Sequence, residues 1–237
     1  MTGGATARPA LLLVAHGSRD PRAGTTVEAI AARVRDLRPG LVVLPSYLDH
    51  AGPRPGAVLA AHPGRFVVLP LLLADAFHAS IDVQAVVDGA GGRAVSASVL
   101  GAAPQLLVIA QDLLDTSGVP RTAAVVLASA GTAQPEANAA TAGHAQRLAQ
   151  LRGAPVVAAF ASAAQPGVEP AIAAMQDAGH QVGVLTWLLA PGRFADQVAA
   201  SARAAGVPCT GVLGEHPGLS ALVLARYDQA APPQSAS

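Results

Sequence analysis

The amino-acid sequence contains one pattern twice. A turn with the sequence HGSRDP begins at His16, and a related turn, AGTAQP, begins at Ala130. Each turn follows an apolar run and precedes a helix-length segment, and their glycines, Gly17 and Gly131, stand 114 positions apart (131 − 17). A repeat of this length indicates a duplicated domain, because solenoid repeats are much shorter.

Each half alternates short apolar runs with helix-length segments. Most of the runs lack a clean alternation of apolar and polar residues, which is typical of parallel strands covered on both faces. The sequence therefore predicts an α/β fold of two duplicated halves, each a mainly parallel sheet with helices on both faces. The predicted strands are residues 10–15, 41–48, 65–72, 93–99, 122–129, 155–161, 181–188 and 208–213. The predicted helices are residues 24–37, 52–62, 81–89, 104–114, 136–151, 168–177, 194–205 and 217–228.

The halves are predicted to span residues 1–115 and 120–237, joined by a short connection containing Ser, Gly and Pro. Asp82 and Asp196 are separated by the same number of positions as the two turns. The apolar run at Leu71 matches the run at Trp187 only if a gap of two residues is allowed. Because the fold is duplicated, one half serves as a control for the other. Residues shared by both halves indicate fold maintenance, and chemistry found in one half indicates a site.

Composition excludes several functional classes. The net charge is zero and no basic run occurs, which argues against nucleic acid as a partner. The chain has no Lys, so neither a P-loop lysine nor a Schiff base is available. Cys209 is the single cysteine, which rules out an internal disulfide and a thiolate metal cluster. No apolar run approaches the ~20 residues of a membrane span, and no export signal is recognised, so we expect a cytoplasmic protein without membrane contact.

Three histidines and a carboxylate follow neighbouring strands of the first half. His16 ends the first predicted strand, Asp49 and His50 end the second, and His78 lies in the loop after the third. Ligands bind beyond the carboxyl ends of parallel strands, so these side chains are expected at one edge of the sheet. His16, His78 and Asp49 form a ligand set that suits Fe²⁺, Co²⁺, Ni²⁺ or Zn²⁺ and leaves coordination positions open.

The duplication supports this prediction, because the counterpart of His16 is Ala130 and that of His78 is either Gly192 or Phe194. A single histidine after a buried strand is more often a structural residue, and that alternative stays open for each one taken alone. The turn after His16 also offers main-chain N–H groups and the side chains of Ser18 and Arg19 to an anion. The remaining histidines, in helix or turn contexts, are interpreted as structural or surface residues: His62, His144, His180 and His216.

The segment Ala15–Pro21 resembles the opening signature of the sirohydrochlorin chelatases, the class II chelatases of siroheme and cobalamin synthesis. The segment Pro70–Val83, with His78 and Asp82, is similar to the second signature of that family. The sequence departs from the family at Asp49, where a Glu is common, and at Gly52, where a second acidic residue is common. These departures concern the acidic contribution and leave both histidines in place.

The resemblance implies a lyase-type enzyme that inserts Fe²⁺ or Co²⁺ into sirohydrochlorin, a tetrapyrrole with eight carboxylates. It implies that His16 and His78 act as metal ligands and proton acceptors, with Asp49 as a third ligand or an orienting group. Ser18 and Arg19 would then bind substrate carboxylates. No cofactor is expected beyond the metal substrate, and the chain is expected to be a monomer or a homodimer. Two alternatives remain: a non-catalytic metal or tetrapyrrole carrier, and a small-anion binding protein with structural histidines.

Overall fold

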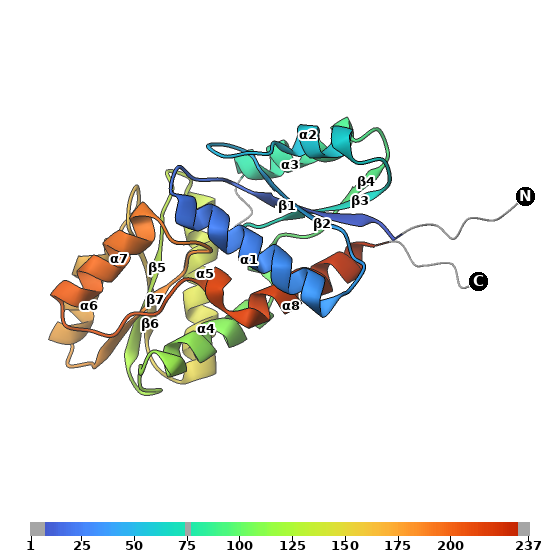
Figure 1. Cartoon of the computed structure of the whole chain (residues 1–237). Helices are drawn as coiled ribbons and strands as arrows, with labels where there is room; N and C mark the ends of the chain where they lie inside the picture. The colour runs from blue at the N-terminus through green and yellow to red at the C-terminus, as the bar shows by residue number, and fades with distance from the viewer. Residues whose placement is uncertain (1–7, 74–76, 232–237) are drawn as a thin grey trace, which may run out of the picture. The chain divides into compact units, whose positions relative to one another are not determined.

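The computed structural model describes residues 8–73 and 77–231, without the side chains of residues 77–81 and 102. Strands and helices alternate along the chain as the sequence predicts (Figure 1). The strands are β1 Ala10–Ala15, β2 Val43–Tyr47, β3 Phe66–Pro70, β4 Ala94–Ser96, β5 Ala124–Ser129, β6 Val156–Phe160 and β7 Val182–Thr186. The α-helices are α1 Pro21–Leu37, α2 Pro55–Ala61, α3 Phe77–Gly89, α4 Gln105–Thr116, α5 Pro135–Arg152, α6 Val168–Asp177, α7 Arg193–Ala204 and α8 Pro217–Ala230.

The first sheet is parallel and has the strand order β2-β1-β3-β4. Its central strand β1 is an uninterrupted apolar run that is fully buried from Leu11 to Val14, since helices cover both faces of the sheet. Leu12 packs with Val58 of α2 and Val83 of α3 on one face. Helix α1 begins directly after the turn, where the Asp20 side chain accepts a hydrogen bond from the Arg22 N–H. This central position of β1 places its carboxyl end between those of β2 and β3.

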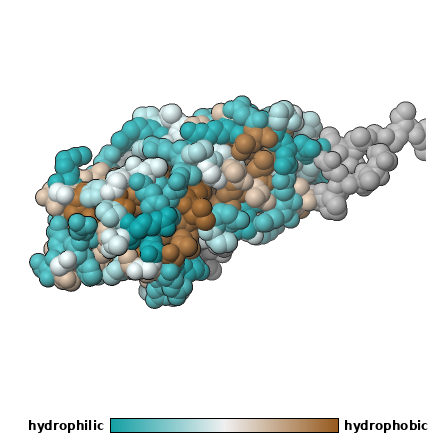
Figure 2. Space-filling view, turned by 90° about the horizontal axis from the view of Figure 1, so that it is seen from below, coloured by the Kyte–Doolittle hydropathy of each residue, from teal (hydrophilic) through white to brown (hydrophobic). Residues whose placement is uncertain are grey.

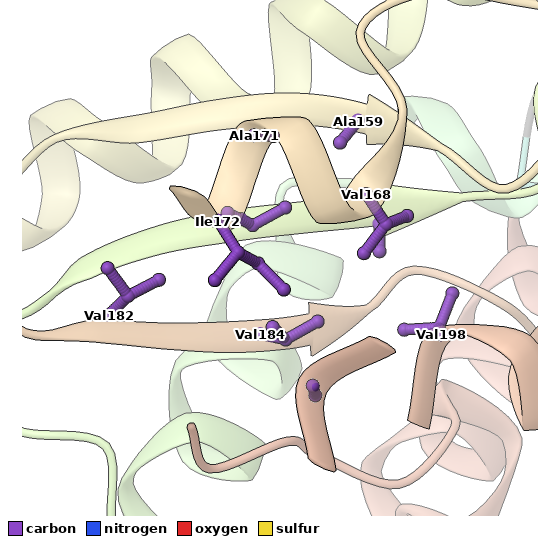
Figure 3. Close-up of a cluster of buried hydrophobic side chains, with 10 residues drawn as sticks. Ala159, Val168, Ala171, Ile172, Val182, Val184 and Val198 are labelled. Carbon is purple, nitrogen blue, oxygen red and sulfur yellow. The ribbon is translucent and has the colours of Figure 1, made fainter. Parts of the chain in front are cut away.

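The second sheet repeats this topology with the order β6-β5-β7, again parallel. Its core lies between the sheet and helices α6 and α7 (Figure 3). Branched side chains of the strands face Ile172 of α6 and Val198 of α7, which are almost fully buried. Both the duplicated α/β architecture and the parallel sheets predicted from the sequence are confirmed.

The packed units differ from the sequence halves in two helices. One compact unit comprises Met1–Ala103 with Ser220–Ser237, and the other comprises Pro104–Leu219. Helix α8 therefore belongs to the unit of the first sheet, where the Tyr227 hydroxyl donates to the Pro9 carbonyl (2.7 Å). Helix α4 belongs to the unit of the second sheet, where the Arg152 guanidinium of α5 donates to the Gln111 side chain of α4 (3.0 Å). Each half thus supplies its last helix to the other unit.

Three local features differ from the sequence prediction. Helix α3 begins at Phe77, so His78 lies in a first helical turn and not in a loop. Residues 208–213 contain an isolated bridge at Cys209 in place of a full strand, because the chain turns into a short 3₁₀-helix at Leu213. Asp82 and Asp196 are not equivalent, since they occupy the sixth position of α3 and the fourth position of α7.

The predicted gap of two residues is confirmed by main-chain hydrogen bonds. The Leu71 N–H donates to the Val14 carbonyl (2.9 Å), and the Trp187 N–H donates to the Ala128 carbonyl (2.8 Å). The acceptors are 114 positions apart (128 − 14) and the donors 116 (187 − 71), so two more residues lie between β5 and the end of β7 than between β1 and the end of β3. Helices α3 and α7 begin with the same shift. Phe194, and not Gly192, is therefore the counterpart of His78.

Hydrophobic residues reach the surface in separate patches on the face drawn in Figure 2, and hydrophilic residues cover most of that face. Large exposed apolar side chains occur singly on several elements, among them Leu37, Val95 and Val108. Within the described residues, none of the helices combines the length and apolar character needed to cross a bilayer.

Candidate metal site

The loop after β2 crosses directly beneath the turn after β1. The main-chain N–H of Asp49 donates to the carbonyl of His16 (2.8 Å), and that of Leu48 donates to Ala15 (2.9 Å). Gly17 has φ +93°, and a Cβ added there would lie 1.8 Å from the Asp49 carbonyl oxygen. Only glycine therefore allows the two loops to approach this closely.

This approach brings three side chains to one edge of the sheet. The His16 and His50 rings lie edge to face, with centroids 6.5 Å apart. The Nε2 atom of His50 lies 3.4 Å from Oδ2 of Asp49. All three side chains are exposed, so a ligand from solvent has access to both imidazoles and to the carboxylate.

Asp49 is held by its own loop. Its Oδ1 accepts a hydrogen bond from the main-chain N–H of His50 (2.8 Å) and one from Nη2 of Arg54 (3.3 Å). These two donors, in that order of effect, hold the pKa of Asp49 below its ordinary value. Arg54 also donates to the Leu48 carbonyl, so its guanidinium joins both sides of the loop. Asp49 is consequently a fixed, ionised carboxylate next to an imidazole.

The second unit contains the same loop without this chemistry. Ser162 donates to Ala130 (2.9 Å) as Asp49 donates to His16, and a Cβ on Gly131 would lie 2.0 Å from the Ser162 carbonyl oxygen. Ala163 has φ +55°, close to the +59° of His50. The backbone is therefore a requirement of the fold, shared by both copies.

The side chains differ at every polar position of this loop. Ala130, Ser162 and Ala163 stand where the first copy has His16, Asp49 and His50. Ser162 has no charge, and its hydroxyl donates to the Ala130 carbonyl (3.1 Å). The imidazoles and the carboxylate are thus additions to a shared scaffold, and their role as site residues stays a prediction.

Comparison with known proteins shows the family of this chain. The sequence profile of the CbiX family matches residues 10–117 and 124–230, so each half matches once and most of the chain is covered. The chain belongs to the CbiX family. The chelatase resemblance carried by the His16 and His78 segments is thereby confirmed. No curated protein sequence gives a significant match.

Solved structures share the fold of this CbiX-family chain. SirB from Bacillus subtilis with Fe³⁺ has a TM-score of 0.77 at 22% identity and covers 94% of this chain and 95% of its own. A sirohydrochlorin chelatase SirB from Bacillus subtilis subspecies spizizenii, in complex with cobalt, has a TM-score of 0.77 at 20% identity, with 94% of each chain covered. A CbiX described as the terminal enzyme of siroheme biosynthesis in denitrifying bacteria has a TM-score of 0.71 at 21% identity, covering 93% of this chain and 99% of its own.

The predicted site residues have different outcomes in this CbiX-family fold. His16 and Asp49 lie together at the expected edge of the sheet. The backbone of His78 lies in α3, and its side chain is outside the described part, so its role as a ligand stays a prediction. Ser18 accepts a hydrogen bond from the Asp20 N–H (3.0 Å), and Thr132 makes the same contact in the second copy, so this bond maintains the turn. Arg19 is exposed and has Ala133 as its counterpart.

Sequence reasoning placed His50 at this edge but did not assign it to the site. Two features point to His50: it is next to Asp49, and its counterpart in the second unit is Ala163. This pairing of His50 with Ala163 follows from the structures of the two loops. Among the described side chains, three His, Cys, Asp or Glu groups do not converge on one point as a complete metal cage would.

Histidines of the second unit serve the fold. His216 uses both ring nitrogens, since Nε2 lies 2.7 Å from Asp112 Oδ2 and Nδ1 accepts from the Gly218 N–H (3.0 Å). His144 is buried in α5 against the Trp187 ring, with centroids 4.9 Å apart. The interpretation of these two histidines as structural is confirmed.

The burial of His144 predicts how the stability of the protein depends on pH. Burial first, and the Arg147 charge second, lower its pKa to about 4. The unfolded chain has a histidine pKa of about 6.5 and therefore binds more protons between these values. We expect the free energy of unfolding to decrease as the pH falls through this window, and a His144→Leu variant to show a smaller decrease. Urea unfolding at about pH 7 and about pH 5 measures this change in the free energy of unfolding, and exposed His180→Leu is the control. If His144→Leu loses as much stability between the two pH values as the wild type, the assignment to His144 is wrong.

Proposed function

We propose that this chain is a chelatase that inserts a divalent metal ion, Fe²⁺ or Co²⁺, into sirohydrochlorin. The observation that carries the proposal is the pair of superposable loops, of which only the first has His16, Asp49 and His50. A chain of the CbiX family with an open imidazole and carboxylate edge has the groups that such a reaction needs. The anion-binding protein requires no such set of metal ligands, whereas a non-catalytic carrier would use the same ligands and is distinguished from a chelatase by turnover.

The reaction exchanges one M²⁺ for the two N–H protons of the macrocycle. An exposed neutral imidazole at His16 binds the ion through a nitrogen lone pair and leaves its other positions to water or to pyrrole nitrogens. Once the ion has passed to the macrocycle, the freed lone pair of the imidazole accepts a proton that a pyrrole nitrogen releases. The metal keeps its oxidation state, so the chemistry calls for no redox cofactor and no ATP.

Recognition of sirohydrochlorin depends on its carboxylates. Arg19 is exposed one residue before Asp20, the N-cap of α1, and its planar guanidinium suits bidentate contact with a carboxylate. The Ser18 hydroxyl accepts from Asp20 and still has its own hydrogen to donate. Two donors beside His16 would anchor the rim of the macrocycle while the ion is transferred. Asp82, which belongs to the second signature, lies in α3.

An anaerobic insertion assay tests the proposal. Purified protein, sirohydrochlorin and either Fe²⁺ or Co²⁺ are mixed, and the absorbance change of the macrocycle is followed. We expect a rate that is proportional to protein concentration and shows multiple turnovers. A stoichiometric burst without turnover indicates the carrier, and a rate equal to that of the protein-free reaction contradicts the proposed function.

A further inference from the structure

We infer that His50 is a metal ligand of this site, paired with His16, and that Asp49 orients His50 instead of binding the ion itself. This inference deepens the proposed function and rests on it for the destination of the ion. His50 is then a ligand and Asp49 a positioning residue. The residue types alone do not show this difference, because both Asp and His can bind a metal ion.

The first support is the occupancy of the Asp49 carboxylate. Oδ1 accepts from the His50 N–H and from Arg54, and Oδ2 faces His50 Nε2 at 3.4 Å. Oδ1 thus has two protein donors that tie the side chain to its own loop, and Oδ2 lies next to the His50 ring. A carboxylate next to Nε2 favours the tautomer with the proton on that nitrogen, and so leaves the Nδ1 lone pair of His50 free. This is the arrangement by which outer carboxylates orient ligating histidines.

The second support is the distance between the two rings. Metal–nitrogen bonds are about 2.0–2.1 Å, so two imidazoles on one ion have centroids roughly 5–6 Å apart. The centroids of His16 and His50 lie 6.5 Å apart, and His50 is 37% exposed. Both side chains reach solvent, and the inference requires torsion rotations that bring one nitrogen of each ring to the ion. Two imidazoles with open positions hold an ion weakly enough for delivery to the macrocycle.

The third support is the conformation of His50. Its φ of +59° is uncommon for a residue with a Cβ, yet the duplicate loop has Ala163 at +55°. The backbone therefore adopts this conformation with either side chain, and it does not require histidine. The ring and ion-pair contacts of this imidazole are with His16 and Asp49, neither of which has a like residue in the second copy. Its presence is explained by a ligand.

Anaerobic Co²⁺ titration, followed by absorbance and calorimetry, tests the inference on the full chain. We expect His50→Ala and His16→Ala each to weaken Co²⁺ binding by at least about 10-fold, because each removes one ligand of the ion. Ala163→His is the matched control. It places an imidazole at the same φ beside a cavity of about 400 Å³, but without an aspartate or a second histidine, and we expect wild-type Co²⁺ binding.

A constructive variant sharpens the test. Ala130→His, Ser162→Asp and Ala163→His together rebuild the three side chains on the second loop, and we expect two Co²⁺ ions per chain in place of one. A folded triple variant that still binds one ion, or a His50→Ala variant with wild-type affinity while His16→Ala is impaired, overturns the inference and leaves the chelatase proposal intact. Conversely, His50-dependent Co²⁺ binding without any turnover of sirohydrochlorin overturns the function and leaves the inference intact.

Discussion

Replacement of His16 by alanine is expected to lower the rate of metal insertion by at least about 10²-fold, the usual effect of losing a positioned acid–base group. The substitution removes a metal ligand and a proton acceptor together. His16 is exposed at the end of β1, outside the core, so the variant is expected to fold normally. His78→Ala should have an effect of the same size if its side chain reaches the same ion.

Asp49→Ala should cost less than either histidine, about 10- to 100-fold, because the carboxylate acts through His50. Turnover is measured anaerobically with sirohydrochlorin and Co²⁺, and circular dichroism confirms folding. His180→Ala, at an exposed position in the second unit, is the control and should keep the wild-type rate. If the His16 and His78 variants both keep near wild-type rates, the proposed site is wrong. If Asp49→Ala is the most impaired, the carboxylate is the main ligand and the order of importance is reversed.

Gly17→Ala is expected to lower both the stability and the activity. A Cβ at this position would lie 1.8 Å from the Asp49 carbonyl oxygen, and the left-handed φ of +93° adds backbone strain. We expect the free energy of unfolding to fall by about 2–4 kcal/mol. The loop must move away to relieve the clash, and this displaces Asp49 and His50 from His16. A displacement of about 1 Å at a catalytic site costs roughly 10²-fold in rate, which we expect per folded molecule.

Two glycines provide matched controls for this effect. Gly131→Ala produces the corresponding clash with Ser162 in the second unit, so it should be similarly unstable but retain its turnover when folded. Gly40→Ala, at φ +82° with open space around it, isolates the backbone strain from the clash. Unfolding in urea and turnover under native conditions are measured for all three. Equal losses of turnover in the Gly17 and Gly131 variants would show that the loop geometry of the first unit has no special role.

The repeated strand–helix order and the parallel sheets could be predicted from the amino-acid sequence. Buried parallel strands require continuous apolar runs such as Leu11–Val14, and these signals are local. The sequence also indicates that His16 and Asp49 share one edge, because β1 and β2 deliver their carboxyl ends to the same side of the sheet. The alignment of the two repeats is also enough to show that Ala130 stands in the second half where the first half has His16.

Tertiary contacts set which unit the last helix of each half joins. The helical pattern of α4 and α8 does not specify the unit, and contacts such as that of Tyr227 with Pro9 do. Tertiary structure also decided the place of His50. Its orientation depends on a left-handed loop residue, on the Asp49 carboxylate and on the approach of Gly17 to Asp49. Contacts between segments distant in the chain leave no periodic trace in the sequence, so this second imidazole became a candidate ligand only once the loops were seen together.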